Sequence, residues 1–316
     1  MFNHVLIKRS HLILTPLLLL SLKANAQGLV LNFPGDLIYG NDDRVEIDYY
    51  PNQSFVEFGN SIALRVSKRR LTEDRNNANR ILFPFIYLKN AIPNICKDEK
   101  FVDQISLGNC SGFLVGKKTL VTAGHCMVNA RECADNKWVF GFKEGVTELV
   151  KDQVYSCKKI ISQRYVYSEN EVSDYAVIEL DREVTNAKPL ETRKFGMIIT
   201  GTPLVVIGHP LGLPMKATDG AKVQRMNDLE RESTLRSLYL RSHYFTTNLD
   251  SYAGNSGSPV FNKRTGKVEG ILIQGAEDFE YNPDRECMES KKLSNSHHES
   301  YEKVMRIKSV PGLPKL

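Results

Sequence analysis

Short apolar runs rich in β-branched and aromatic residues recur along the middle of the chain, and Gly, Pro, Asn or Asp bound most of them. This pattern is typical of strands that end in turns. The predicted strands are residues 112–115, 119–122, 138–142, 175–180, 203–207, 244–247, 259–261 and 268–273. Because no series of long helical patterns alternates with these runs, the pattern disfavours a parallel α/β sheet and favours β-barrels or a β-sandwich.

Two segments have a different pattern. Residues 228–240 are strongly charged, with leucines at irregular spacing, and we interpret them as an insertion whose structure the pattern does not define. In residues 299–308, the apolar side chains of Tyr301, Val304 and Met305 fall on one face at helical spacing. This spacing predicts a C-terminal helix.

The first 26 residues have the features of an export signal. Lys8 and Arg9 precede an apolar run at residues 12–22, and residues 24–26 (Ala-Asn-Ala) supply the small side chains at which signal peptidase cleaves. The run is too short to cross roughly 30 Å of hydrocarbon, so an uncleaved membrane anchor is the weaker alternative. We predict a signal peptide over residues 1–26 and a secreted protein, extracellular or periplasmic. Residues 27–95 then form an N-terminal extension or propeptide plus the start of the main domain.

Charge narrows the classes of function. The 316 residues include 42 Lys and Arg against 37 Asp and Glu, and 41% are hydrophobic. Three of the basic residues lie in the first 26 residues, which contain no acid, so the remainder carries 39 basic against 37 acidic side chains. Such a balanced surface argues against a nucleic-acid partner and against a polybasic membrane patch. Composition does not address oligomeric state.

All six cysteines lie beyond residue 26, and no two have the CxxC spacing typical of zinc sites, so we expect disulfides. Six cysteines allow 15 connectivities. If residues 112–115 and 119–122 form a hairpin, Cys110 and Cys126 meet at its open end. Closing that loop is worth roughly 3 kcal/mol in the chain-entropy model. For the other four we favour Cys133–Cys157, which leaves Cys96–Cys287 by elimination.

Three motifs carry the candidate chemistry. His125 follows a predicted strand in the sequence Thr-Ala-Gly-His-Cys, Asp174 precedes a second strand, and Ser256 lies between glycines before a third. A serine hydroxyl becomes a strong nucleophile when a histidine takes its proton, and an aspartate on the far ring nitrogen orients that histidine. Each motif alone is commonly structural; their joint occurrence at three strand ends favours catalysis. Glycines beside Ser256 let backbone amides converge on one oxygen, so the amides of Gly254 and Ser256 are the predicted oxyanion hole.

These motifs resemble those of the chymotrypsin-like serine proteases, in particular the exported bacterial branch that includes the glutamyl endopeptidases. Residues 39–44 (Tyr-Gly-Asn-Asp-Asp-Arg), 110–115 and 207–210 also resemble that branch. The resemblance implies His125 as general base, Asp174 as its orienting carboxylate, Ser256 as nucleophile, and protein or peptide substrates. It further implies an all-β fold of two antiparallel six-stranded barrels. We assign residues 96–190 to the first barrel, 191–280 to the second, and 281–316 to a C-terminal segment with the predicted helix.

Cleavage specificity is open at the level of sequence. Asp250 and Ser251 lie where trypsin-like relatives hold the base of the primary pocket, which favours cleavage after Arg or Lys. The alternative for Asp250 is a turn in which its carboxylate caps backbone amides. Glutamyl specificity is the rival, but Leu272 stands where that branch carries a histidine. Residues 273–275, with Ile273 and Gly275 at the ends, are the predicted edge on which a substrate strand would add.

Other features limit the alternatives. Asn255 stands where digestive relatives place an aspartate that pairs with a freed N-terminus, so activation by that ion pair is not expected. The acidic residues near position 42 lack a calcium-loop pattern, and we predict neither a metal nor an organic cofactor. A catalytically silent binding module with the same fold is the alternative class of function.

Overall fold

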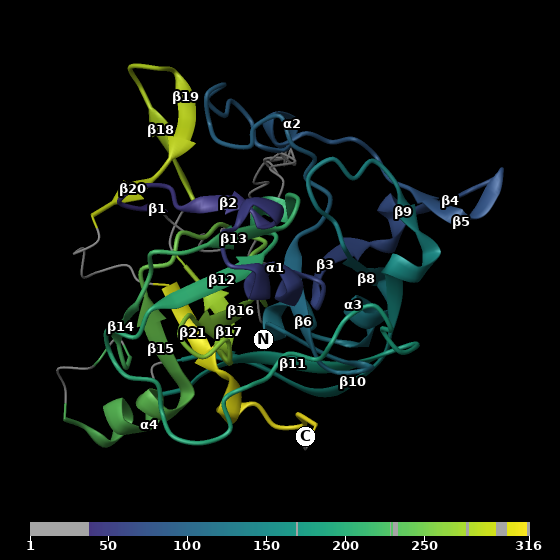
Figure 1. Cartoon of the computed structure of the whole chain (residues 1–316). Coiled ribbons are helices and arrows are strands. Elements are labelled where there is room, and N and C mark those ends of the chain that lie inside the picture. Colours follow the sequence, from purple (N-terminus) through teal and green to yellow (C-terminus); the bar gives the residue numbers. More distant parts are fainter. Residues whose placement is uncertain are drawn as a thin grey trace, which may run out of the picture. The chain divides into compact units, whose positions relative to one another are not determined.

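The computed structural model describes residues 38–168, 170–227, 229, 233–275, 278–294 and 302–314 (Figure 1). The predicted signal peptide lies outside these residues. Among them, no helix is both long and apolar enough to span a bilayer.

Six antiparallel strands close into a barrel, in the order β10-β11-β7-β6-β3-β8. Their bounds are β3 Ile62–Ser67, β6 Cys110–Gly116, β7 Thr119–Thr122, β8 Asn136–Phe140, β10 Val154–Tyr167 and β11 Val172–Leu180. Successive side chains of a strand point to opposite faces, and here both faces are covered. Leu120 packs inside the barrel with Trp138, whereas the adjacent Val121 joins a second cluster that includes Ile271 of the other sheet. This double burial explains the continuous apolar runs in the sequence.

A second, open sheet has eight strands in the order β14-β15-β21-β17-β16-β12-β13-β2. Their bounds are β2 Arg44–Glu46, β12 Leu204–Gly208, β13 Lys216–Thr218, β14 Val223–Arg225, β15 Tyr244–Thr247, β16 Pro259–Asn262, β17 Val268–Gln274 and β21 Glu302–Arg306. The all-β prediction with two barrel-like halves is confirmed, although the second half is open rather than a closed six-stranded barrel. Both ends of the described chain contribute to it, because β2 forms one edge and β21 lies between β15 and β17.

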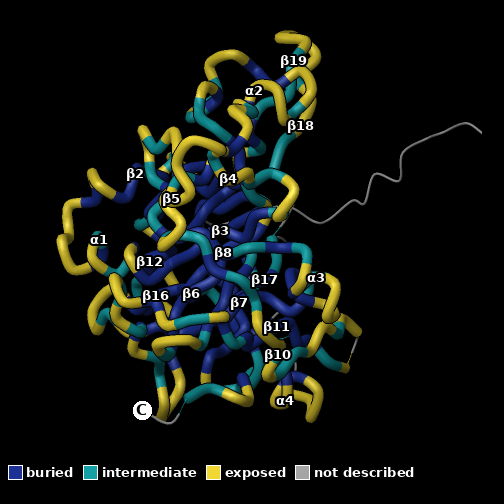
Figure 2. Tube along the Cα trace, turned by 90° about the vertical axis from the view of Figure 1, so that its right-hand side faces the viewer, coloured by how far each residue is buried: buried dark blue, intermediate teal, exposed yellow. Residues whose placement is uncertain are grey.

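Smaller elements lie around these sheets. The further strands are β1 Ile38–Tyr39, β4 Thr72–Asp74, β5 Asn77–Leu82, β9 Leu149–Val150, β18 Phe279–Asn282, β19 Cys287–Ser290 and β20 Lys292–Leu293. The α-helices are α1 Gln53–Gly59, α2 Leu88–Ala91, α3 Ala130–Asp135 and α4 Leu235–His243, and 3-10 turns span η1 Ile47–Tyr49, η2 Lys68–Arg70, η3 Gly124–Cys126, η4 Lys151–Gln153, η5 Pro210–Gly212 and η6 Ile307–Ser309. Figure 2 shows that the central strands are buried, whereas the β18–β19 hairpin is largely exposed.

The predicted C-terminal helix is wrong. Residues 302–306 form strand β21, in which Val304 pairs with Phe245 on one side and Leu272 on the other. Val304 and Met305 enter different apolar clusters, on the two faces of the sheet. In so short a segment the apolar spacing fits a helix or a strand, and the neighbouring strands decided the outcome.

The boundaries of the two halves also differ from those expected. The first barrel begins with β3, before residue 96, and the N-terminal region supplies β2 to the second sheet. Part of the charged insertion, residues 235–240, lies in helix α4; residues 228 and 230–232 lie outside the described residues.

The three disulfides are Cys96–Cys287, Cys110–Cys126 and Cys133–Cys157, as predicted. Two of them brace the first barrel locally, at sequence separations of 16 and 24 residues. The third spans 191 residues and ties the segment between β5 and β6 to the β18–β19 hairpin (Figure 1, top).

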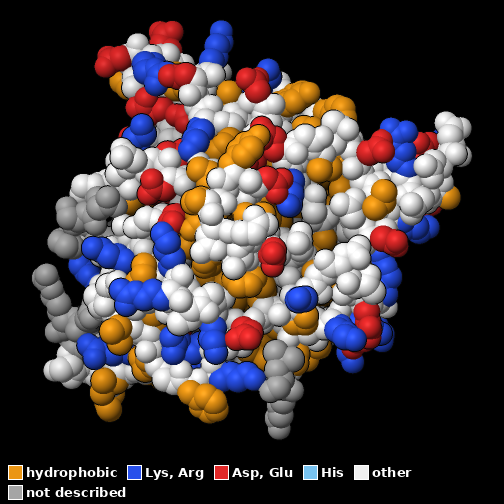
Figure 3. All heavy atoms as spheres, in the orientation of Figure 1, with side chains coloured by type: hydrophobic (Ala, Val, Ile, Leu, Met, Phe, Trp, Pro, Cys, Tyr) orange, Lys and Arg blue, Asp and Glu red, His pale blue; other side chains and the backbone are white. Residues whose placement is uncertain are grey.

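Acidic and basic side chains are interspersed around that hairpin, in the upper part of Figure 3. Arg285 there pairs with both Asp98 and Glu289. Charge on this part of the surface is therefore mixed, as the balanced composition suggested.

Candidate active site

His125 lies in the 3-10 turn η3, directly after β7. The turn packs tightly against β10 and β11: a Cβ atom on Gly124 would lie 2.1 Å from the carbonyl oxygen of Arg164. Only glycine permits this approach, and the disulfide of Cys126 ties the other side of the turn to β6. The local sequence Gly-His-Cys thus fixes where the imidazole stands.

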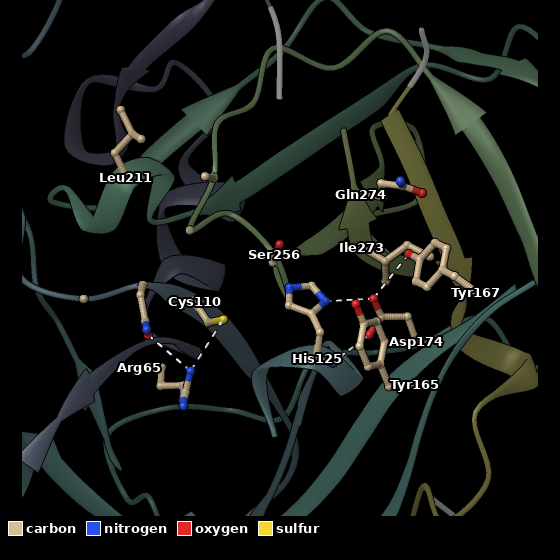
Figure 4. Close-up of a pocket in the computed structure, with 14 residues that line it drawn as sticks. Arg65, Cys110, His125, Tyr165, Tyr167, Asp174, Leu211, Ser256, Ile273 and Gln274 are labelled. Atoms are coloured by element: carbon tan, nitrogen blue, oxygen red, sulfur yellow. Dashed lines mark hydrogen bonds and ion pairs between the residues drawn. The ribbon is translucent and has the colours of Figure 1, made fainter. Parts of the chain in front are cut away.

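Asp174 lies on β11 and its side chain is fully buried. Its Oδ2 atom is 2.7 Å from Nδ1 of His125, and its Oδ1 atom accepts a hydrogen bond of 2.9 Å from the His125 backbone amide. With the carboxylate accepting from Nδ1–H, the imidazole is held in the tautomer that leaves Nε2 free to accept a proton. Figure 4 shows Nδ1 directed at Asp174 and the rest of the ring directed toward Ser256.

Ser256 lies in a tight loop between β15 and β16, flanked by two glycines with positive φ angles, +90° at Gly254 and +89° at Gly257. A Cβ on Gly257 would lie 2.1 Å from the carbonyl oxygen of Ser111, so the loop can approach β6 only with glycine there. The Ser111 amide in turn donates to the Ser256 carbonyl, at 2.8 Å. In the described part of the chain no hydrogen bond joins the Ser256 hydroxyl to His125, and such bonds commonly form only once substrate is bound.

The backbone of this loop is arranged for an anion. The amides of Asn255 and Gly257 donate to the carbonyls of Tyr252 and Leu272, whereas those of Gly254 and Ser256 donate to no other described residue. These two amides, on either side of Asn255, are the ones predicted for the oxyanion hole, and that role stays a prediction.

Asn255 holds the loop from inside. Its side-chain amide donates to Ser251 Oγ at 3.1 Å, and its oxygen accepts from Ser258 Oγ at 2.9 Å. The buried amide therefore has neutral partners on both sides. Ser251, expected in the substrate pocket, lies in this network and does not line the cavity.

A cavity of about 550 Å³ opens over His125 and Ser256, with residues from both halves of the fold. Its walls are formed by Arg65, Gly108, Asn109, Cys110, His125, Tyr165, Tyr167, Asp174, Leu211, Ala253, Gly254, Ser256, Ile273 and Gln274. Of the predicted substrate-binding residues, Ile273 lines it; Asp250, Ser251 and Gly275 do not.

Asp250 lies elsewhere than expected. Its carboxylate accepts backbone hydrogen bonds from Tyr39 at 2.6 Å and from Asp43 at 2.9 Å, so it secures the N-terminal segment beside β20. This geometry corresponds to the backbone-capping alternative and corrects the assignment of Asp250 to the pocket base. Burial raises the pKa of Asp250 to about 7 despite the amides, and the nearby Asp42 and Asp43 carboxylates add to this rise.

Sequence reasoning missed Tyr165 and Tyr167. Both project from β10 toward the cavity, and Tyr165 pairs directly with Asp174 across the ladder. A signal existed, because two tyrosines two residues apart in a strand share one face. It could not be used without knowing that β10 pairs with the strand that carries Asp174.

Metal binding does not fit this site. Ligand atoms of Cys110, His125 and Cys126 lie within 4.8 Å of one another, but both sulfurs belong to one disulfide. A disulfide supplies no thiolate, and thiolate is the form in which cysteine binds metals.

The fold, the buried Asp174–His125 pair and the serine loop define a class of protein that comparison with known proteins identifies. A family profile described as trypsin-like peptidase domain matches residues 110–271, about half of the chain, and the chain belongs to this family. A glutamyl endopeptidase of Bacillus licheniformis is 28% identical over 169 residues, 52% of this chain and 48% of that protein. The chain thus spans about half the length of this curated relative.

Two solved structures match this chain at low sequence identity. The VesB protease of Vibrio cholerae has a TM-score of 0.48 and 15% identity, over 86% of this chain and 64% of that one. A Glu endopeptidase in complex with MPD has the same TM-score and identity, over 86% of this chain and 94% of that one.

Proposed function

We propose that this protein is an exported serine endopeptidase that hydrolyses peptide bonds through an acyl-enzyme. The observation that supports it best is the convergence of Ser256, His125 and Asp174 on one cavity, with Asp174 2.7 Å from the inner nitrogen of the ring. Three disulfides fit an oxidising compartment outside the cytoplasm.

Each residue has one role in this proposal. His125 Nε2 takes the proton of Ser256 as Oγ attacks the scissile carbonyl, and it then gives that proton to the leaving amine. Asp174 holds the ring and stabilises the imidazolium that forms. The amides of Gly254 and Ser256 donate to the oxyanion, and one such donor is typically worth about 3 kcal/mol of transition-state stabilisation. Water then attacks the acyl-enzyme, again with His125 as the general base, and releases Ser256.

Substrate backbone would add along residues 273–275, beside the cavity. Ile273, at the end of β17, lines the same cavity as Ser256, which supports this edge as the substrate site. An extended peptide can pair with this edge by main-chain hydrogen bonds. Gly275, which has no side chain, leaves room there for the side chains of the peptide.

The residue before the scissile bond is a separate question. Because Asp250 is engaged with backbone amides outside the cavity, the expected preference for Arg or Lys has lost its structural basis. The related Bacillus protein is named for glutamyl cleavage. Apart from the His125–Asp174 pair, Arg65 is the one charged side chain among the described residues that line the cavity, and it pairs with Glu132. We infer a preference for an uncharged residue at this position.

A peptide panel tests the proposal. The peptides differ only in the residue before the scissile bond (Arg, Lys, Glu, Phe or Ala), and a fluorophosphonate probe reports the reactive serine. We expect turnover and labelling by the wild type, loss of both in Ser256→Ala, and retention of both in Ser54→Ala on the exposed helix α1. Folded protein that neither cleaves any peptide nor reacts with the probe would indicate the binding-module alternative. Selective cleavage after Arg, Lys or Glu would overturn only the inferred specificity.

A further inference from the structure

We propose that Tyr167 is a positioning residue for the reaction: its hydroxyl holds the Asp174 carboxylate in place and draws negative charge from the oxygen that faces His125. The inference rests on the proposed function, since it concerns the same site. Tyr167 acts through Asp174 and contacts no reacting atom.

The geometry distinguishes Tyr167 from its neighbour. Tyr165 and Tyr167 both face the cavity from β10, but only the Tyr167 hydroxyl donates to Asp174, at 3.2 Å from Oδ2 (Figure 4). Tyr165 instead places its ring 5.9 Å from the imidazole of His125. Among described residues its hydroxyl makes no hydrogen bond.

Asp174 needs such a donor because it is fully buried. A buried carboxylate is stable as an anion only when hydrogen bonds replace the lost water. Asp174 has three donors in the described structure: the amide and ring of His125, and the Tyr167 hydroxyl. Tyr167 is the one donor that does not belong to His125, so it anchors the carboxylate to β10 independently of the imidazole.

The Tyr167 hydroxyl keeps its proton at any working pH. Although 38% of Tyr167 is exposed, loss of water around its hydroxyl raises the pKa of Tyr167 well above its ordinary value, and the Asp174 charge raises it further. The hydroxyl can therefore only donate to Asp174. It shares Oδ2 with the ring of His125, and each donor draws negative charge from that oxygen.

The sign of the effect follows. Without the hydroxyl, more negative charge remains on Oδ2 beside the ring, which stabilises the imidazolium. The carboxylate also loses its anchor and can rotate, so the imidazole is held less firmly for proton transfer.

Other groups near Asp174 do not account for the expected stabilisation of the imidazolium. From β10, burial raises the pKa of Tyr165, which stays neutral; from β15, Tyr244 is near enough to contribute to the raised pKa of Tyr167. The charged Arg164 and Glu171 pair with each other at the exposed end of the hairpin, and His243 of α4 lies on the Glu171 side. Ile273 and Gln274 of β17 carry no charge. Each of these groups remains unchanged when only the Tyr167 hydroxyl is removed.

The test compares Tyr167→Phe with Tyr165→Phe, measuring kcat and KM from pH 4.5 to 9 on the best peptide of the panel. For Tyr167→Phe we expect kcat to fall about 3- to 10-fold, with KM changed by less than about twofold because the ring stays in the cavity wall. The acid limb of kcat/KM should move up by about 0.5 pH unit. In Tyr165→Phe, the acid limb should stay at its wild-type position.

Outcomes separate this inference from the proposed function. If the wild type is folded but cleaves nothing and resists the fluorophosphonate, the proposed function fails. If the wild type is active and Tyr167→Phe keeps the wild-type acid limb, the inference alone fails, whatever its melting temperature does. A shift of the same size in Tyr165→Phe would also overturn it, because that hydroxyl does not reach Asp174.

Discussion

The half of the fold that carries His125 and Asp174 and the half that carries Ser256 are built differently. The first is a closed barrel whose six strands come from residues 62–180 alone, and both of its disulfides are local. The second is an open sheet that takes β2 from the N-terminal region and β21 from the C-terminal one. The third disulfide, Cys96–Cys287, joins two segments outside both sheets that are 191 residues apart.

This difference shows what each catalytic group depends on. The His125–Asp174 pair is fixed by contacts between strands that are close in sequence, from η3 and β11. The serine loop depends on remote segments. Strand β21 lies inside its sheet, between β15 and β17, and Asp250, which precedes Ser256 in the same loop, secures residues 39 and 43. Contacts between remote segments carry a larger entropic cost of closure, so the serine half should be the more sensitive one.

The largest effect should come from removing the remote strand. A chain ending at residue 301 lacks β21 and leaves β15 and β17 without their shared neighbour. Because Met305 also belongs to the apolar cluster shared by both halves, we expect cooperative loss of the whole fold. Circular dichroism and a thermal melt measure this. A chain ending at residue 310 keeps β21 and is the control; a truncated chain that still melted like this control would refute the dependence.

Next in size is the loss of either catalytic partner. His125→Ala removes a group of the barrel and Ser256→Ala a group of the sheet, yet both act in one step, so each should lower kcat by about 10⁴- to 10⁶-fold. The double variant should be no slower than either single one. Steady-state kinetics on the best peptide decide this. Multiplicative losses in the double variant would show that the two halves contribute separately.

The disulfides allow local and long-range contacts to be compared through the free energy of unfolding. In the chain-entropy model the 16-residue separation of Cys110–Cys126 is worth about 3 kcal/mol and the 191-residue separation of Cys96–Cys287 about 5 kcal/mol. Replacing each pair by alanines should therefore lower the free energy of unfolding more for Cys96–Cys287. Urea unfolding of the two double variants measures the difference. The opposite order would mean that the β18–β19 hairpin opens locally without unfolding the sheet.

The smallest effect concerns Asp250. Asp250→Asn replaces one side-chain oxygen by an NH2 group, which cannot accept a hydrogen bond. The backbone amide of either Tyr39 or Asp43 then loses its acceptor, so we expect a loss of about 1–3 kcal/mol in the free energy of unfolding at pH 5. The order of preference in the peptide panel should not change, since Asp250 lies outside the cavity. A selective loss of cleavage after Arg or Lys would restore the pocket role.

The same variant has a pH signature. Because the pKa of Asp250 is raised from 3.8 to about 7 in the folded protein, its stabilisation is fully present below about pH 4 and is lost as the pH rises through about 7. The wild type should lose more stability between pH 5 and pH 8 than Asp250→Asn does. Urea unfolding at both pH values tests this, and equal slopes would mean that Asp250 is ionised throughout.

Prediction from sequence succeeded where the signal was local. The turn that presents His125 and the glycines around Ser256 are each defined within a few residues, and the pairing of Cys110 with Cys126 follows from one hairpin. Prediction failed where one sequence pattern was compatible with two different local structures. Residues 302–306 suited a helix until β15 and β17 were known to flank them. Asp250 suited a pocket until residues 39 and 43 were found against it.

The sequence by itself determined the all-β character, the Cys110–Cys126 pair and the residue types of the candidate triad, because turns, glycines and strand runs act over short stretches. Only the tertiary structure decided that the serine sheet is open, that β21 lies within it, and that Tyr167 reaches Asp174. These features depend on which strands become neighbours. That choice depends on the burial of both sheet faces across remote segments, which no local pattern encodes.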